Sequence, residues 1–133
     1  MKYLLDTCVI SDFIKGNRNT LIRLKQTPPS QIMISSITLM EIEYGLAYNK
    51  ERAKKIEKPI HDIIHCTTTL PFTTGDAIQA AKARAYLRQR GNPIGYYDIL
   101  IAGAALNNNL ILVSANEKEF NRLTGLQVEN WRE

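Results

Sequence analysis

Short apolar runs that alternate with longer helical patterns constrain the fold of this chain more than any other feature. The clearest run extends from Leu110 to Val113, with no polar residue between them. Unbroken apolar runs are typical of parallel strands that helices cover on both faces. Residues 2–5 and 31–35 contain similar runs. Because such strands alternate with helices, the sequence predicts a three-layer α/β fold with a central, mainly parallel sheet flanked by helices.

Helical periodicity predicts most of the connections between these strands. We expect helices at residues 8–15, 18–26, 38–48, 51–65, 74–90, 96–107 and 117–122, and a final extended piece near 126–129. The 96–107 segment is apolar on nearly all sides and should therefore be buried. Pro59 lies inside the 51–65 segment and should kink or break it, because proline lacks the N–H that a helix interior needs.

Length and composition narrow the class of protein without identifying it. The 133 residues fit one domain over residues 1–133. A net charge of +4 permits nucleic-acid binding but does not demonstrate it. No stretch approaches the roughly 20 apolar residues of a membrane span, and the first residues do not fit a secretory signal. Cys8 and Cys66 have no zinc-site spacing and indicate free thiols. We therefore expect a cytoplasmic protein that does not enter a membrane.

Four acidic or amide side chains lie just beyond apolar strands or at helix starts. They are Asp6, Glu41, Asp98 and Asn116. Ligands of parallel sheets collect beyond the carboxyl ends of the strands, so all four can share one edge of the predicted sheet. Carboxylates that converge repel one another, and a divalent cation removes that penalty. The pattern therefore predicts a Mg²⁺ or Mn²⁺ site, and metal, water and phosphate together indicate nuclease chemistry.

Each of these residues also has a purely structural interpretation. Asp6 is placed to cap the helix that follows it. Glu41 follows Thr38 at the spacing of a capping box, and the Ser114–Glu117 segment has the same spacing. Asp98 in a first helical turn complements the helix dipole. Helix capping does not explain why all four positions should fall on the same edge.

Four collinear motifs carry a family resemblance that covers essentially the whole chain. They are Leu4–Ser11 (LLDTCVIS), Ser35–Gly45 (SSITLMEIEYG), Gly91–Ala102 (GNPIGYYDILIA) and Leu112–Phe120 (LVSANEKEF), followed by Gly125-Leu126 and Glu129-Asn130-Trp131. In these motifs the chain resembles the PIN-domain ribonucleases, and among them the VapC toxins of type II toxin–antitoxin systems. Any one motif alone would be a weak signal, whereas four in order are specific.

The resemblance implies roles for particular residues. Asp6, Glu41 and Asp98 match the metal-binding acids of the family. Asn116 stands where some members have Asp and others Asn. Glu119 matches an acid that is often present and that would act through water. The remaining correspondences are Thr7 beside the first acid, Ser114 where Thr is usual, and Tyr97 where Asn is frequent.

The resemblance also implies a function. We expect an endoribonuclease that depends on Mg²⁺ or Mn²⁺ and hydrolyses RNA, such as structured tRNA, by metal-activated water. We also expect a homodimer that a cognate VapB-like antitoxin neutralises. One alternative is a PIN-like RNA-binding module that has lost catalysis, although the intact acids argue against it. Another is a signalling domain phosphorylated on an acid, but Cys8 and Lys118 do not provide the second acid and the late lysine that it needs.

Three further sequence signals have competing interpretations. Arg84 and Arg88 are one helical turn apart and suit adjacent phosphates, while Tyr96 and Tyr97 suit base stacking or core packing. His61 and His65 have the spacing of two zinc ligands without an obvious third. The apolar residues Leu46, Ile56 and Ile60 suit an antitoxin groove, an ordinary core or a dimer interface.

Overall fold

A single parallel sheet forms the centre of the molecule. The computed structural model describes residues 2–133, and its sheet has the strand order β3-β2-β1-β4-β5. Every neighbouring pair is parallel. The strands are β1 (Tyr3–Leu5), β2 (Ile32–Ser35), β3 (Thr68–Leu70), β4 (Ile111–Val113) and β5 (Val128–Glu129). The predicted α/β class and parallel sheet are therefore confirmed.

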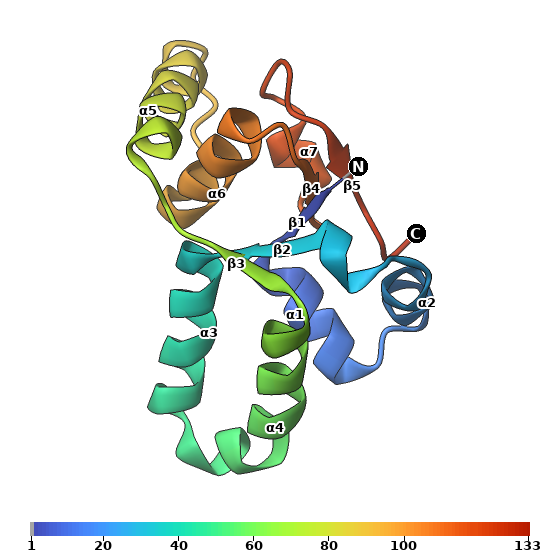
Figure 1. Cartoon of the computed structure of the whole chain (residues 1–133). Coiled ribbons are helices and arrows are strands. Elements are labelled where there is room, and N and C mark those ends of the chain that lie inside the picture. The colour runs from blue at the N-terminus through green and yellow to red at the C-terminus, as the bar shows by residue number, and fades with distance from the viewer. Residues whose placement is uncertain (1) are drawn as a thin grey trace.

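Helices cover both faces of this sheet (Figure 1). Leu5 packs into one core with residues of α1 (Thr7–Lys15), α3 (Ser36–Tyr48) and α4 (Lys50–Cys66). Leu4, its neighbour in β1, points the other way into a core with α5 (Thr74–Gln89), α6 (Tyr96–Asn107) and α7 (Glu117–Phe120). The remaining helices are α2 (Arg18–Gln26) and the 3-10 turn η1 (Pro29–Gln31). Alternating side chains of one strand thus divide the interior into the two cores of a three-layer fold.

Most predicted elements are present, with two differences. α4 runs from Lys50 to Cys66 without a break at Pro59, so a break there was wrong. Ala53, Ile60 and Ile64 are buried on either side of the proline, and this tertiary packing offsets the missing helix hydrogen bond. The second difference is β3, which the sequence analysis left unassigned because Thr68-Thr69-Leu70 has no apolar run.

The strand register determines where the site is built. Leu5 pairs with Ile34 in β2 and with Val113 in β4, so the central strands end at the same level. The backbone N–H of Asp6 still donates to the carbonyl of Val113 at 3.1 Å, and the chain then turns into α1. The residues that follow these strands consequently emerge together at the carboxyl edge of the sheet.

No helix among residues 2–133 is both long and apolar enough to cross a bilayer.

The α5–α6 pair forms the most extensive helix–helix contact in the described part of the chain. A Cβ added to Gly103 of α6 would lie 2.6 Å from the Cβ of Ala80 and 2.7 Å from its backbone nitrogen. The start of α5 is joined to the end of α6 by the buried Asp76, which accepts hydrogen bonds from Asn107 and Asn108 at 2.9 and 3.0 Å. Because α6 carries Asp98, this contact also sets the position of one predicted site residue.

We predict that Gly103→Ala destabilises the protein by about 1–3 kcal/mol, because the added methyl overpacks a contact with backbone that cannot move aside. The matched control is Gly45→Ala in α3, where an added Cβ meets nothing within 4 Å. There the substitution should stabilise the protein by about 0.5–1 kcal/mol, because it removes a glycine from the interior of a helix. Urea unfolding followed by circular dichroism measures both. Equal midpoints for the two variants would contradict the close contact.

Candidate active site

The predicted acidic residues converge on one cavity. Asp6, Glu41, Asp98 and Asn116 all line an open cavity of about 450 Å³ at the carboxyl edge of the sheet. They come from four different places in the fold, namely the end of β1, α3, the first turn of α6 and the start of α7. The placement that the sequence predicted from strand ends is therefore the one observed.

Asp6 combines a structural role with its place in the cavity. Its carboxylate caps α1 by accepting from the N–H of Val9 at 3.2 Å. The thiol of Cys8 donates to the same oxygen at 2.8 Å. Burial raises the pKa of Asp6, and these hydrogen bonds oppose the rise. Burial and the charge of Asp6 raise the pKa of Cys8 to about 12, so the thiol stays protonated and acts as a donor.

Glu41 projects into the cavity from inside α3. The helix begins after the N-cap Ser35, so Thr38 lies within it and the capping-box interpretation was wrong. The hydroxyl of Thr7 instead donates to Glu41 Oε1 at 2.9 Å, which joins α1 to α3 across the site. Glu43 faces elsewhere, because its carboxylate bonds His61 at 2.9 Å.

Asp98 is the acid whose ionisation the site disturbs most clearly. Partial burial, together with the charges of Asp6, Glu41 and Glu119, raises its pKa to about 6. A carboxyl group in the first turn of a helix would ordinarily be stabilised in its charged form by the helix dipole. The raised pKa indicates that burial and the repulsion between the acids together outweigh the favourable effect of the helix end.

The fourth position is organised by side-chain hydrogen bonds. The side chain of Asn116 caps no N–H of α7. Its backbone N–H donates to the hydroxyl of Ser114 at 2.9 Å, and its amide donates to Glu119 Oε2 at 2.8 Å. Ser114 is fully buried, so it supports the site without lining it. Glu119 acts on the cavity through its charge on Asp98 and through its bond to Asn116.

The predicted substrate residues occupy a second cavity. Arg84, Arg88 and Tyr96 line a pocket of about 230 Å³ between α5 and the start of α6. The guanidinium of Arg84 lies 5.6 Å from the centre of the Tyr96 ring. Tyr97 does not line this pocket, and both tyrosines are at least half exposed, so the core-packing alternative was wrong for them.

The acidic cavity is also lined by residues that the sequence analysis missed. Lys15 and Arg132 line it, together with Ser11. Lys15 ends α1, four residues after the first motif, and Arg132 directly follows the closing Glu129-Asn130-Trp131. Only the folded arrangement brings these cations to the acids, so no local pattern could have identified them.

The donor set suits a hard divalent cation. Carboxylate and amide oxygens are ligands that Mg²⁺ and Mn²⁺ accept. Within the part of the chain that the structure describes, no three His, Cys, Asp or Glu side chains are close enough to hold an ion directly. Mg²⁺ keeps several waters and takes only one or two carboxylates, so a wide acidic cavity fits a hydrated ion. The acids' mutual repulsion at Asp98 is relieved by such a charge.

Zinc at the histidine pair is not supported. The rings of His61 and His65 stack with centres 6.3 Å apart, and His61 is bonded to Glu43. Among residues 2–133, no third His, Cys, Asp or Glu side chain lies close enough to complete a metal site with them.

Comparison with known proteins places the chain in a family. Residues 3–126 match the PIN domain. The chain is similar to the tRNA(fMet)-specific endonuclease VapC of Salmonella typhimurium, with 33% identity over 131 residues and 98% of each chain covered. It is also similar to ribonuclease VapC2 of Haemophilus influenzae, with 34% identity and the same coverage.

Solved structures give the same result. The crystal structure of DNA-bound VapBC from Salmonella typhimurium contains a chain with a TM-score of 0.89 and 33% identity, covering 98% of both chains. VapBC-1 from nontypeable Haemophilus influenzae contains one with a TM-score of 0.85 and 30% identity, covering 100% of both. With the sequence match, the parallel sheet and the acidic cavity in agreement, this chain belongs to the PIN-domain family and, within it, to the VapC ribonucleases.

Proposed function

We propose that this protein is a Mg²⁺- or Mn²⁺-dependent endoribonuclease and the toxin of a type II toxin–antitoxin system. The observation that carries the proposal is the convergence of Asp6, Glu41 and Asp98 on one cavity, where partial burial, together with the charges of the other acids, raises the pKa of Asp98 to about 6. Such an arrangement is unfavourable for the protein alone and becomes favourable when a cation binds. Destabilised charge of this kind is typical of functional sites.

The residues of the cavity have distinct tasks in this proposal. Asp6, Glu41 and Asp98 hold the cation, which supplies a Lewis acid that activates water and offsets the charge of the phosphodiester. Thr7 fixes the rotamer of Glu41 through its 2.9 Å hydrogen bond, and the thiol of Cys8 orients Asp6 in the same way. Asn116 presents an amide whose orientation Glu119 fixes. These hydrogen bonds restrict the carboxylates before an ion binds, which lowers the cost of reorganisation.

Structured RNA such as tRNA is the proposed substrate. The Salmonella relative is named for cleavage of tRNA(fMet), and this chain shares 33% of its residues. The pocket of Arg84, Arg88 and Tyr96 suits an RNA loop, because guanidinium groups bind phosphates and an exposed ring stacks on an unpaired base. Tyr97, about half exposed beside Asp98, remains a predicted substrate contact.

A VapB-like antitoxin is the proposed protein partner. An apolar groove of about 180 Å³ runs between α1, α3 and α4 and includes the predicted residues Leu46, Ile56 and Ile60. Thr7, Ser11 and Glu41 line both this groove and the acidic cavity. A helix bound in the groove would therefore reach the active site directly. Solved relatives include DNA-bound VapBC from Salmonella typhimurium and a toxin–antitoxin complex from Klebsiella pneumoniae. Homodimer formation remains a prediction.

A catalytically inactive RNA-binding module is the alternative function. It would keep the basic pocket and would not need the acids. The presence of three carboxylates in one cavity, where the charged form of Asp98 is disfavoured, favours the nuclease instead.

We predict that purified protein cleaves unfractionated tRNA with Mg²⁺ or Mn²⁺, that EDTA abolishes cleavage, and that Asp98→Asn reduces it by at least about 100-fold through the loss of a cation ligand. Gel electrophoresis and end sequencing measure the products. Glu43→Gln is the matched control, because it removes a carboxylate of the same helix as Glu41 that is turned away to His61. Wild type and Asp98→Asn with equal activity, or binding without cleavage, would favour the inactive module.

Without metal, Asp98→Asn should be more stable than the wild type at pH 7, because it removes a charge that the folded state disfavours. The pKa of Asp98 is about 6 in the folded protein against an ordinary 3.8. As pH falls from 6 to 4, the folded protein binds the proton more tightly than the unfolded chain does, so the wild type becomes more stable. The difference in stability between the wild type and Asp98→Asn should therefore narrow.

Thermal melts in EDTA across this pH range measure the effect, and addition of Mg²⁺ should stabilise the wild type more than the variant. A variant that melts below the wild type in EDTA at pH 7 would contradict the repulsion that we infer.

A further inference from the structure

One wall of the acidic cavity includes a positively charged side chain from the last residues of the sequence. Arg132 lines this cavity beside Asp6, Glu41 and Asp98. It lies outside the sheet and the helices, three residues after the end of β5 at Glu129. Its position therefore depends on how the tail is attached to the rest of the molecule.

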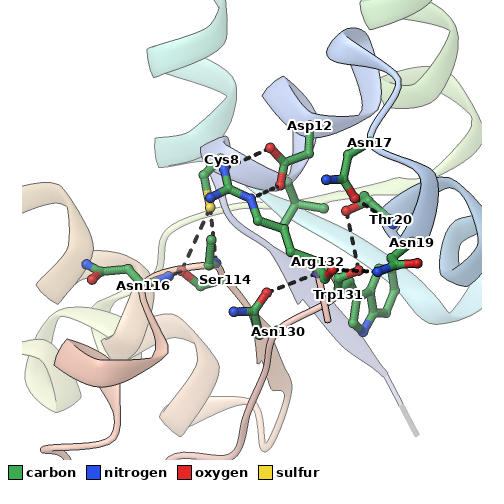
Figure 2. Close-up of polar contacts among 12 residues, drawn as sticks. Cys8, Asp12, Asn17, Asn19, Thr20, Ser114, Asn116, Asn130, Trp131 and Arg132 are labelled. Carbon is green, nitrogen blue, oxygen red and sulfur yellow. Dashed lines mark hydrogen bonds and ion pairs between the residues drawn. The ribbon is translucent and has the colours of Figure 1, made fainter.

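The tail is held firmly against the corner between α1 and α2. Trp131 is buried, with its ring centre 5.3 Å from that of Tyr3. The carbonyl of Arg132 accepts from the amide of Asn19 at 2.7 Å, and its N–H donates to Asn130 Oδ1 at 3.0 Å. The two hydrogen bonds, drawn in Figure 2, fix the backbone on both sides of the Arg132 side chain.

The guanidinium itself is held by one buried acid. Nε donates to Asp12 Oδ2 at 2.6 Å and Nη2 donates to Asp12 Oδ1 at 2.8 Å, so the contact is two-pronged (Figure 2). The Asp12 side chain is 7% exposed and that of Arg132 is 46% exposed. Asp12 does not line the cavity. Of the two partners, therefore, only Arg132 lines the acidic cavity, and Asp12 supports it from the protein interior.

Part of the guanidinium remains available to a ligand. Among residues 2–133, no acceptor is bonded to Nη1. An arginine uses Nε and Nη2 on one edge and can present Nη1 and the second Nη2 hydrogen on another. Asp12 therefore orients the side chain without using all of its donors.

We propose that Arg132 binds a phosphate of the RNA substrate beside the scissile bond, and that Asp12 positions it for this contact. The inference rests on the proposed nuclease function and deepens it. An RNA backbone entering the cavity meets three carboxylates, which repel its phosphates. A fixed guanidinium at the wall offsets that repulsion, and its planar fork matches a phosphate group better than a lysine would.

The competing interpretation is that the Arg132–Asp12 pair only fastens the tail to α1. The chain provides a matched control for that role. Arg23 forms a second ion pair with the tail, at 2.7 Å to Glu129, and lies 5.1 Å from the centre of the Trp131 ring. Arg23 does not line the acidic cavity. Its removal loosens the tail in a similar way but leaves the cavity wall unchanged.

The test compares Arg132→Gln, Asp12→Asn and Arg23→Gln in full-length protein with unfractionated tRNA as the probe. Cleavage rates are measured with Mg²⁺ at low tRNA concentration. RNA binding is measured across salt concentrations in an Asp98→Asn background, so that the probe is not consumed. Melting temperatures are recorded for each variant.

We expect Arg132→Gln to slow cleavage by about tenfold, the effect of one lost charge-assisted hydrogen bond. The slope of log affinity against log salt should become shallower by about 0.7, the value for one phosphate contact on a single strand. Asp12→Asn should slow cleavage and leave that slope unchanged, because the cation remains but is no longer oriented. Arg23→Gln should lower the melting temperature only.

If Arg132→Gln matches Arg23→Gln in cleavage rate and salt slope, the contact with phosphate is refuted and the pair is a tail clamp. If Arg132→Gln does not fold, Arg132→Lys decides the question. Our proposal predicts that it keeps the wild-type slope and cleaves more slowly, and a wild-type cleavage rate would refute it. A wild type that does not cleave tRNA with metal would instead overturn the proposed function, which separates the two failures.

Discussion

Repulsion between carboxylates at one edge of a parallel sheet is the constraint on which the rest of the structure depends. β1, β2 and β4 end at the same level, so the residues that follow them must emerge close together. Asp6 follows β1 directly, and Glu41 and Asp98 reach the same cavity from the helices. Partial burial, together with the charges of the neighbouring acids, raises the pKa of Asp98 to about 6. The fold sustains this unfavourable arrangement because each layer of helices buries an apolar core against its own face of the sheet.

The supporting contacts reduce movement of the acids while leaving their repulsion in place. Asp6 accepts hydrogen bonds from Cys8 and Val9. Glu41 accepts one from Thr7, and Glu119 accepts one from Asn116. Each donor is neutral, so it orients a carboxylate without cancelling its charge. Arg132 differs because its charge is partly balanced by Asp12, which is buried and outside the cavity. The site therefore keeps a strong negative potential for a cation, with positive charge only at its wall.

Sequence reasoning predicted those features that depend on local pattern and parallel topology. Apolar runs identified the central strands, and strand ends placed Asp6 and Asn116 at the correct edge. Features that depend on contacts between distant segments were not predictable in this way. Arg132 meets Asp12 across 120 positions, and Pro59 is accommodated because its helix is packed on the core on both sides of it. β3 has almost no apolar signal because its first residue is exposed at the edge of the sheet.

Anomalous X-ray diffraction from crystals soaked in Mn²⁺ tests the central claim most directly, because it locates the ion without relying on activity. We predict an anomalous peak inside the acidic cavity, with carboxylate oxygens of Asp6, Glu41 or Asp98 at about 2.0–2.2 Å, the usual distance for small hard cations. The peak should disappear in crystals of Asp98→Asn. A cavity without a peak, or a peak only at the exposed His61 and Glu43 pair, would contradict the account.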